Sequence, residues 1–315
     1  MRRQKPLLVS ICLLVAVAGV LLFLSRTDDE VSLNAALEIW ADIIRDIDRV
    51  GLTMTRVSVK RETEIGLQIE QEIAGYRRPK DDPPLQAYVA EVGQTLLDHI
   101  QRRGIRYRFY IVDSPMINAH AISGGGIYIT TGMLKILESE AELAAILGHE
   151  ISHVDLRHCI DRLQYEIAAR KIGGSDLAAI ARVGYVLAGV AFSEQQELEA
   201  DAGGAILAAK ARYDPRAAVA IFERLTKLKA QKYGEEKARR EKPTTMTEEL
   251  GAALGKALEQ YFATHPPMEA RVRDLNKVLD RNARAWQGHR FYVGRSNYQD
   301  RIPRLHSERQ TEWRS

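Results

Sequence analysis

The hydrophobic pattern of the chain begins with an almost wholly apolar run over residues 7–24, preceded by three basic residues. A helix of this length spans about 27 Å, close to the hydrocarbon thickness of a bilayer. Basic residues in front of a span hold the N-terminus in the cytoplasm and send the rest of the chain across. We therefore predict that residues 1–26 form an uncleaved signal-anchor. The alternative is a signal peptide cut after residues 16–18, which would leave apolar residues behind the cut.

Helical periodicity follows this apolar run. Apolar positions at helical spacing predict amphipathic helices over residues 33–50, 57–75 and 85–102. A run of prolines and charges at 77–84 separates the second helix from the third. We expect residues 31–105 to form a helical entry region.

Strand-like patterns lie in the middle of the chain. Residues 107–112 alternate and are rich in β-forming side chains, which predicts a strand. Residues 118–123 and 127–130 have a similar character, with a glycine triplet at 124–126 between them. Glycine within a strand pattern indicates the close approach of another backbone. That backbone can be a bound peptide that adds as a strand along the sheet edge. The alternative is that the glycines form a hairpin joining two core strands.

The C-terminal half is more irregular. Residues 172–192 are small and apolar but interrupted by charges, which predicts a buried or membrane-grazing helix covering the site, not a full span. A charged run favours a solvated, mobile insertion over residues 226–258. The tail, residues 301–315, is polar, and we expect it to fray.

Charge and cysteine content exclude some classes of protein. The net charge is +3 with 28% charged residues, so the chain lacks the basic footprint of a nucleic-acid-binding protein. The two cysteines, Cys12 and Cys159, lie in different contexts and imply no disulfide framework. A length of 315 residues allows one large domain or two small ones.

The candidate chemistry begins with His149, Glu150 and His153, an H-E-x-x-H pattern on a predicted helix. Residues four apart share one helix face, so both imidazoles can bind one Zn²⁺, with Glu150 beside the open position as a base. Ser139 and Glu142 read as a capping box at the start of this helix. The alternative is a surface helix with two solvated histidines.

A catalytic zinc site needs a third protein ligand. The metzincin spacing is excluded because its histidine would fall on Cys159 and its glycine on Leu156. If one helix continues through residues 143–162, His158 points roughly 140° away from His153 and cannot replace the missing ligand.

A second acidic helix supplies a better third ligand. Glu197 and Asp201 are four residues apart, and small residues follow them that allow close packing. Glu197 can bind the metal, while Asp201 can accept the N–H of a ligating imidazole, most simply that of His149, and fix its tautomer. The alternative is an ordinary solvated acidic face.

These two segments resemble a known family. HEISH at 149–153 and ELEAD at 197–201 are similar to the gluzincin family of HtpX-like heat-shock proteases, BepA-like periplasmic proteases and CAAX prenyl proteases. Further similar segments, spread over roughly residues 60–300, are 118–129, 264–271 and 291–295. The chain departs from the family pattern at His120, where Phe is common, and at Ser123, where Pro is common.

The resemblance implies an α+β fold, a mainly helical zincin-like metalloprotease domain over residues 106–300 with a small mixed β-sheet beside the zinc-binding helix. It implies that a substrate strand binds along Asn118, Ala119, His120, Gly124 and Gly125. The side chain of His120 either faces the cleft or is an ordinary surface histidine.

The resemblance also concerns His265 and Arg271 of the late T-H-P segment. His265 either simply precedes a helix or approaches the zinc, where it displaces water in a resting state or steadies the oxyanion during turnover. Arg271 is expected to fix its helix by an ion pair with a buried carboxylate.

The function that these features imply is that of a metalloendopeptidase with one Zn²⁺ per chain, acting on unfolded or misassembled extracytoplasmic proteins. The location implied is the bacterial inner membrane with the catalytic domain in the periplasm or cell exterior, or the periplasm after signal cleavage. One alternative is a chaperone or assembly factor that uses the same metal-stabilised peptide groove. A CAAX-type prenyl protease is less consistent, because such enzymes normally need several membrane spans and this chain predicts one.

Overall fold

The computed structural model describes residues 56–76, 79–169, 176–187, 192–238 and 268–314. Residues Val57–Ser315 make up one compact unit, so the predicted boundary near residue 105 lies inside it. The predicted anchor, the helix at 33–50, His265 and the insertion beyond residue 238 lie outside the described residues. Within the described ranges, we find no helix with the length and apolar character needed to span a bilayer.

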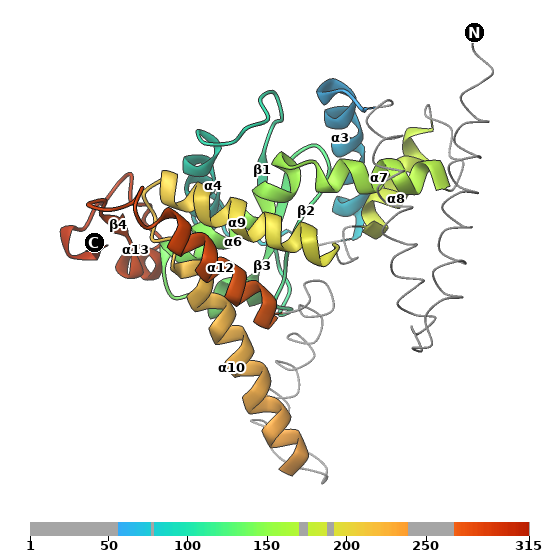
Figure 1. Cartoon of the computed structure of the whole chain (residues 1–315). Coiled ribbons are helices and arrows are strands. Elements are labelled where there is room, and N and C mark those ends of the chain that lie inside the picture. Colours follow the sequence, from blue (N-terminus) through green and yellow to red (C-terminus); the bar gives the residue numbers. More distant parts are fainter. Residues whose placement is uncertain (1–55, 77–78, 170–175, 188–191, 239–267, 315) are drawn as a thin grey trace, which may run out of the picture. The chain divides into compact units, whose positions relative to one another are not determined.

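The described chain is mainly helical with a small mixed sheet, so the predicted α+β class is confirmed (Figure 1). The helices are α3 (Val59–Tyr76), α4 (Pro83–Leu97), α5 (Thr131–Ile136), α6 (Glu140–Asp155), α7 (His158–Ala169), α8 (Leu177–Leu187), α9 (Glu194–Lys210), α10 (Ala217–Ala238), α12 (Met268–Asn282) and α13 (Arg295–Asp300). The strands are β1 (Arg108–Val112), β2 (Ala119–Ala121), β3 (Gly126–Thr130), β4 (Phe291–Tyr292) and β5 (Trp313–Arg314).

The three-stranded sheet has the order β1-β3-β2, with β3 parallel to β1 and antiparallel to β2. Tyr128 on β3 lies opposite Tyr110 on one side and His120 on the other. The three rings form a column, with 5.0 Å between neighbouring ring centroids. The ring of His120 is therefore taken up by a cross-strand stack, and its side chain is only 6% exposed.

The glycine segment between β2 and β3 is a tight hairpin. Gly124 and Gly125 have φ values of +86° and +95°, which glycine adopts at little cost. A Cβ at Gly124 would lie 2.8 Å from the Cα of Gly66 on α3, and one at Gly125 would lie 2.7 Å from the carbonyl oxygen of Arg106. The close backbone approach predicted from the glycines is made by α3 and by Arg106. The segment itself joins strands β2 and β3, as in the hairpin alternative.

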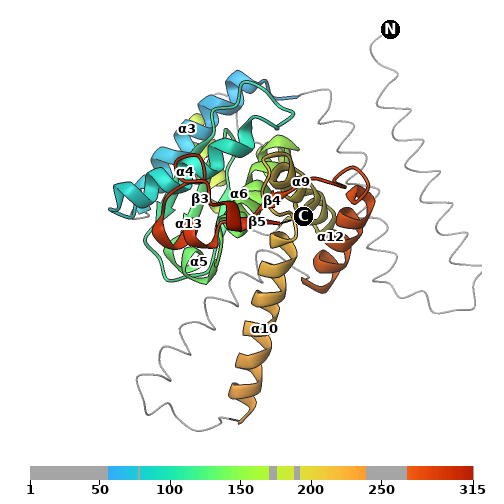
Figure 2. The same cartoon turned by 90° about the vertical axis from the view of Figure 1, so that its left-hand side faces the viewer.

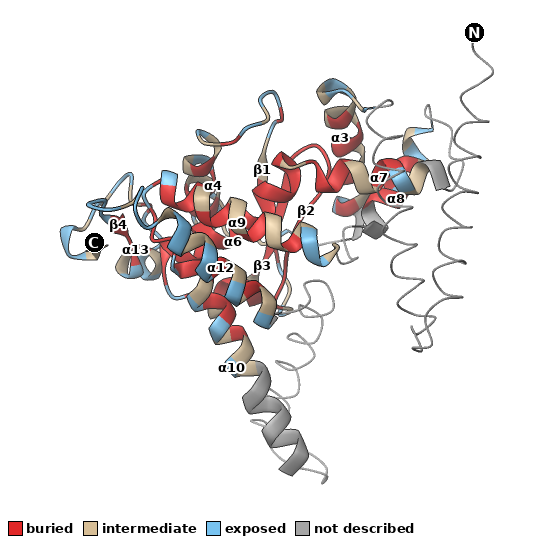
Figure 3. Ribbon diagram, viewed as in Figure 1, coloured by how far each residue is buried: buried red, intermediate tan, exposed pale blue. Residues whose placement is uncertain are grey.

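Helix α6 is the centre of the packing, and every one of its residues is buried (Figure 3). The Ser139 side chain caps it by accepting the backbone N–H of Glu142, as predicted. The other half of the predicted capping box is wrong. The Glu142 carboxylate instead accepts the N–H of Glu138 at 2.8 Å and pairs with Arg224 of α10 at 2.7 Å. The Glu142 carboxylate is thus engaged by Glu138 and Arg224 and not by the backbone N–H of Ser139.

A break divides the helix that the sequence predicts over residues 143–162. Helix α6 ends at Asp155, Arg157 adopts the left-handed φ of +70°, and α7 starts at the next residue. The Asp155 carboxylate accepts the backbone N–H groups of Gln101 and Arg102, which follow α4. Because these contacts involve residues distant in sequence, helical periodicity alone could not reveal the break.

Helix α9 makes the most extensive contact with α6 of any described element. Their backbones meet at Gly148 and Gly204, where a Cβ added to Gly204 would lie 2.6 Å from the backbone nitrogen of His149. Helix α12 packs on α9 and α10, while α8 packs on α3 and α7. The described part of the predicted 172–192 helix is thus a packing helix, with Ile180 and Ala181 buried.

The C-terminal tail is ordered, so the prediction that it frays is wrong. Strand β5 pairs with β4, and the two lie beside α13 in Figure 2. The buried Asn297 donates to the carbonyls of Ile302 and Ser307, and Arg304 donates to the carbonyl of Ala211. Polar composition misled the sequence analysis here, because these polar groups hydrogen-bond to the body of the protein.

The glycine crossing of α6 and α9 gives the first prediction. We expect Gly204→Ala to lower the free energy of unfolding by about 1–2 kcal/mol, since the cost of overpacking exceeds the gain in helix propensity. Gly203→Ala is the neighbouring comparison on the same helix, because its Cβ would meet the Ser152 side chain and not the α6 backbone, and we expect it to cost less than Gly204→Ala. Urea denaturation of both variants measures the difference. Equal stability of Gly204→Ala and the wild type would contradict the close crossing.

Candidate metal centre

Two helices bring three ligand-type side chains together. His149 and His153 lie one turn apart on α6, and their Nε2 atoms are 3.1 Å from each other. The Glu197 carboxylate of α9 lies 3.6 Å from each of these nitrogens. All three side chains are buried, and in the described chain this cluster could hold a metal ion. The predicted site requires Glu197 to lie close to both histidines. The structure places its carboxylate within reach of both.

The start of α9 fixes the position of Glu197. Ser193 and Gln196 form a capping box, with the Ser193 hydroxyl accepting a backbone N–H and the Gln196 side chain accepting that of Ser193. Glu197 follows in the first turn and is 0% exposed. This capping box was not predicted, although the sequence contains its S-x-x-Q pattern.

Asp201, one turn after Glu197, contacts the other nitrogen of His149. Its Oδ1 atom is 2.8 Å from His149 Nδ1. A proton on Nδ1 that is donated to this carboxylate leaves the Nε2 lone pair of His149 directed at the cluster. This is the contact expected for Asp201 from the sequence.

Arg271 of α12 is fully buried and pairs with both Asp201 and Glu197. Its guanidinium donates two hydrogen bonds of 2.7 Å to Asp201 and lies 3.2 Å from the Glu197 carboxylate. Burial alone would raise the pKa of Asp201, but Arg271 and the hydrogen bond from His149 outweigh it and hold that pKa at about 2. The buried carboxylate expected as the partner of Arg271 is therefore Asp201, and the sequence analysis missed the additional contact with Glu197.

The carboxylates also act on His149. Burial lowers the pKa of His149, but the hydrogen bond and charge of Asp201 exceed this effect and the net shift is upward. The pocket thus favours positive charge at this point even though it is closed to solvent. A divalent cation supplies such a charge.

His153 is held by a different set of groups. Its ring stacks on Phe192 with 3.9 Å between centroids, and Arg162 lies over Phe192 as well. Its Nδ1 atom is 3.0 Å from Nδ1 of His158, which in turn contacts Glu199. The prediction that His158 points away is wrong, because it assumed a continuous helix. Burial lowers the pKa of His158 and favours its neutral form.

The remaining predicted residues differ in how they relate to the cluster. Glu150 follows His149 on α6 and is 2% exposed. Asn118 precedes β2, and Ala119 and His120 belong to this strand, which contacts α6 and pairs only with β3 in the described part of the chain. Gly124 and Gly125, described above, are turn residues packed on the chain itself.

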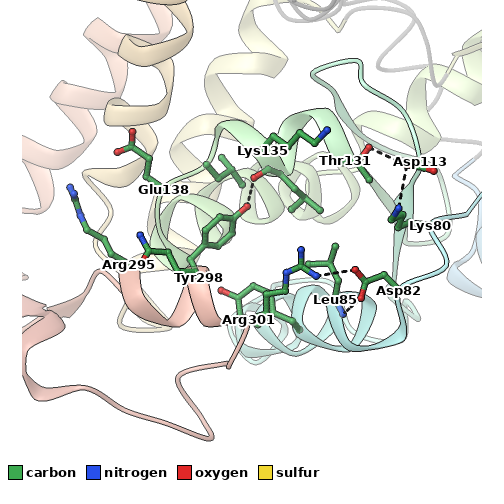
Figure 4. Close-up of a pocket in the computed structure, with 14 residues that line it drawn as sticks. Lys80, Asp82, Leu85, Asp113, Thr131, Lys135, Glu138, Arg295, Tyr298 and Arg301 are labelled. Atoms are coloured by element: carbon green, nitrogen blue, oxygen red, sulfur yellow. Dashed lines mark hydrogen bonds and ion pairs between the residues drawn. The ribbon is translucent and has the colours of Figure 1, made fainter.

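A separate cavity of about 840 Å³ lies among α4, α5 and α13 and contains none of the cluster residues (Figure 4). Two ion pairs lie in its wall: Lys80 with Asp113 at 3.8 Å, and Asp82 with Arg301 at 2.9 Å. The Tyr298 hydroxyl donates to a backbone carbonyl of α5. The contacts of Tyr298 and Arg301 join α13 and its C-cap to α5 and to the N-cap of α4.

Comparison with known proteins identifies a family and several relatives of this chain. Residues 83–279, more than half of the chain, match Peptidase family M48. The chain is 31% identical over 179 residues to the mitochondrial metalloendopeptidase OMA1 of Arabidopsis thaliana, covering 55% of this chain and 31% of that protein. It is 26% identical over 186 residues to the beta-barrel assembly-enhancing protease of Escherichia coli K12, covering 54% and 38%. The chain therefore spans about a third of these relatives, and the resemblance drawn from the sequence is confirmed.

The buried charges give the second prediction. Arg271→Leu leaves Asp201 and Glu197 without their buried cation, and we expect the metal-free protein to lose about 3–5 kcal/mol of unfolding free energy. Arg273→Leu removes the same charge from an exposed position of the same helix and is expected to change stability by about 0.5 kcal/mol or less. Chemical denaturation in the presence of a chelator compares the two. Similar losses in both variants would contradict the role of Arg271.

Proposed function

Because the chain belongs to Peptidase family M48, we propose that it is a zinc-dependent metalloendopeptidase that cleaves unfolded or misassembled extracytoplasmic proteins. The observation that carries this proposal is the convergence of His149, His153 and Glu197 from two helices. Relatives whose names include metalloendopeptidase and protease support the same reaction class.

The donor atoms fit zinc. Ligands bound at about 2.0–2.1 Å in a tetrahedral zinc site lie roughly 3.3 Å from one another. The three distances here, 3.1, 3.6 and 3.6 Å, bracket this value. Two imidazoles and one carboxylate form the three-ligand set typical of catalytic zinc, which keeps a fourth position for water.

The reaction follows from the roles of the side chains. When bound, zinc lowers the pKa of a coordinated water towards neutrality and polarises the scissile carbonyl. Glu150 takes the proton from the attacking water and passes it to the leaving amine. Asp201 holds the Nδ1 proton of His149, and Arg271 holds Asp201. His265 is proposed to steady the developing oxyanion or to close the site at rest.

Strand β2 is the proposed binding edge for the substrate. It lies at the end of the sheet and contacts α6, so a peptide added along Asn118 and Ala119 would run beside the metal helix. Such binding requires an extended segment, which favours unfolded or misassembled targets. The buried stack on His120 and the hairpin at Gly124 and Gly125 would support this edge from within.

We further propose that the chain is held at a membrane by residues 7–24 and that its catalytic unit lies on the extracytoplasmic side. The support for this proposal is the length of the apolar run and the basic residues in front of it. The assembly-enhancing name of the Escherichia coli relative agrees with misassembled envelope proteins as targets.

The third prediction concerns Glu150. We expect Glu150→Gln to retain one zinc per chain and to cleave denatured casein about 10²–10⁴-fold more slowly, because the proton acceptor is lost. The matched control is Glu194→Gln, an exposed position on α9 that should cleave at the wild-type rate. Zinc is quantified by elemental analysis and cleavage by peptide release.

Undiminished cleavage by purified Glu150→Gln would remove Glu150 from its proposed role. The same variant separates the protease from the chaperone in cells. Rescue of a deletion strain by Glu150→Gln would favour the chaperone, whereas a failure to rescue would favour proteolysis.

A further inference from the structure

The two imidazoles of the cluster are supported in chemically different ways. Nδ1 of His149 contacts a carboxylate, that of Asp201, at 2.8 Å. Nδ1 of His153 contacts a second imidazole nitrogen, Nδ1 of His158, at 3.0 Å. Nε2 of His158 then lies 3.1 Å from Oε2 of Glu199 on α9.

One arrangement of protons satisfies this chain of contacts. For His153 to bind a metal through Nε2, its proton must be on Nδ1, which then donates to His158. His158 must accept through Nδ1, so its own proton is on Nε2 and is donated to Glu199. The Glu199 carboxylate, at the end of this series of hydrogen bonds, therefore fixes the tautomers of both imidazoles.

We propose that His158 and Glu199 are positioning residues that hold His153 in its metal-binding tautomer and orientation, as Asp201 does for His149. This inference rests on the proposed metal site. His158 is not a ligand, because its Nδ1 meets the nitrogen of His153 that faces away from the cluster.

The backbone is arranged so that this contact forms. On a continuous helix, a residue five positions after His153 would lie roughly 140° away around the axis. The break at Arg157, with its φ of +70°, brings His158 back to the His153 ring. A left-handed arginine is an uncommon conformation for a side chain with a Cβ, and the contact that it permits is buried.

Helix α9 provides both the third ligand and the carboxylate that ends the series of hydrogen bonds from His153. Glu197 is the ligand, and Glu199, two residues later, meets His158. The other carboxylate oxygen of Glu199 accepts a hydrogen bond of 2.8 Å from Gln195. The movement of α9 against α6 would therefore disturb the support of His153 together with the ligand.

The test is zinc affinity, measured on the full chain by competition with a chromophoric chelator. We expect His158→Leu to weaken zinc binding about 10–100-fold, the usual cost of losing an outer partner of a ligating histidine. His158→Asn retains an acceptor oxygen where Nδ1 stood, and we expect it to remain within about threefold of the wild type. His306→Leu removes a histidine from an exposed pair with Glu91 and is the matched control.

A second pair of variants avoids the buried position. Glu199→Ala should weaken zinc binding about three- to tenfold, less than His158→Leu. It removes the acceptor for His158 but leaves the direct contact between His158 and His153. Glu194→Ala removes the same charge from an exposed position in the first turn of the same helix and should leave affinity unchanged. Visible spectra of the Co²⁺-loaded proteins should shift for His158→Leu and match the wild type for His158→Asn.

The outcomes separate this inference from the proposed metal site. If His149→Ala binds zinc as tightly as the wild type, the metal site itself is wrong. If His149→Ala loses zinc while folded His158→Leu and Glu199→Ala keep wild-type affinity, the positioning role is wrong. Equal losses in His158→Leu and His158→Asn would also overturn it, because the acceptor atom would then have no effect.

Discussion

The close crossing of α6 and α9 is the constraint on which the rest of the site depends. Two glycines, Gly148 and Gly204, let the backbones approach so closely that a Cβ on Gly204 would lie 2.6 Å from the nitrogen of His149. The histidines come from one helix and Glu197 from the other, so the spacing of the three donor atoms is set by this backbone contact. Larger residues at the crossing would move the two helices apart and so separate the donor atoms, even with all three donor residues unchanged.

The charges of the pocket explain why a cation is expected at this point. Glu197 and Asp201 carry two formal negative charges, and Arg271 supplies one positive charge, so the three buried side chains sum to −1. Buried charge is costly unless it is compensated. The upward shift in the pKa of His149 reflects the same demand for positive charge. A divalent cation between the donor atoms meets this demand without requiring protonation of the histidines that must bind it.

The sequence predicted those features that depend on local spacing. The H-E-x-x-H pair, the acidic residues at 197 and 201, and the α+β class all follow from residues that are near each other in the chain or from two short motifs. Two features that depend on other distant contacts were not predicted correctly. Glu142 binds Arg224 instead of completing its capping box, and the polar tail is ordered by Asn297 and Arg304. Neither helical periodicity nor polarity identifies the hydrogen-bond or ion-pair partners of these residues.

The break after α6 shows how such an error affects the site itself. On a continuous helix, a residue five positions after His153 cannot contact the His153 ring. This argument is valid only while the helix continues. Asp155 binds the backbone at Gln101 and Arg102, the helix stops, and His158 turns back to His153. A tertiary contact more than fifty residues away in sequence thus accompanies a change in the surroundings of the His153 imidazole. The tautomer of His153 therefore depends on the docking of the segment after α4 as well as on the metal-binding helix.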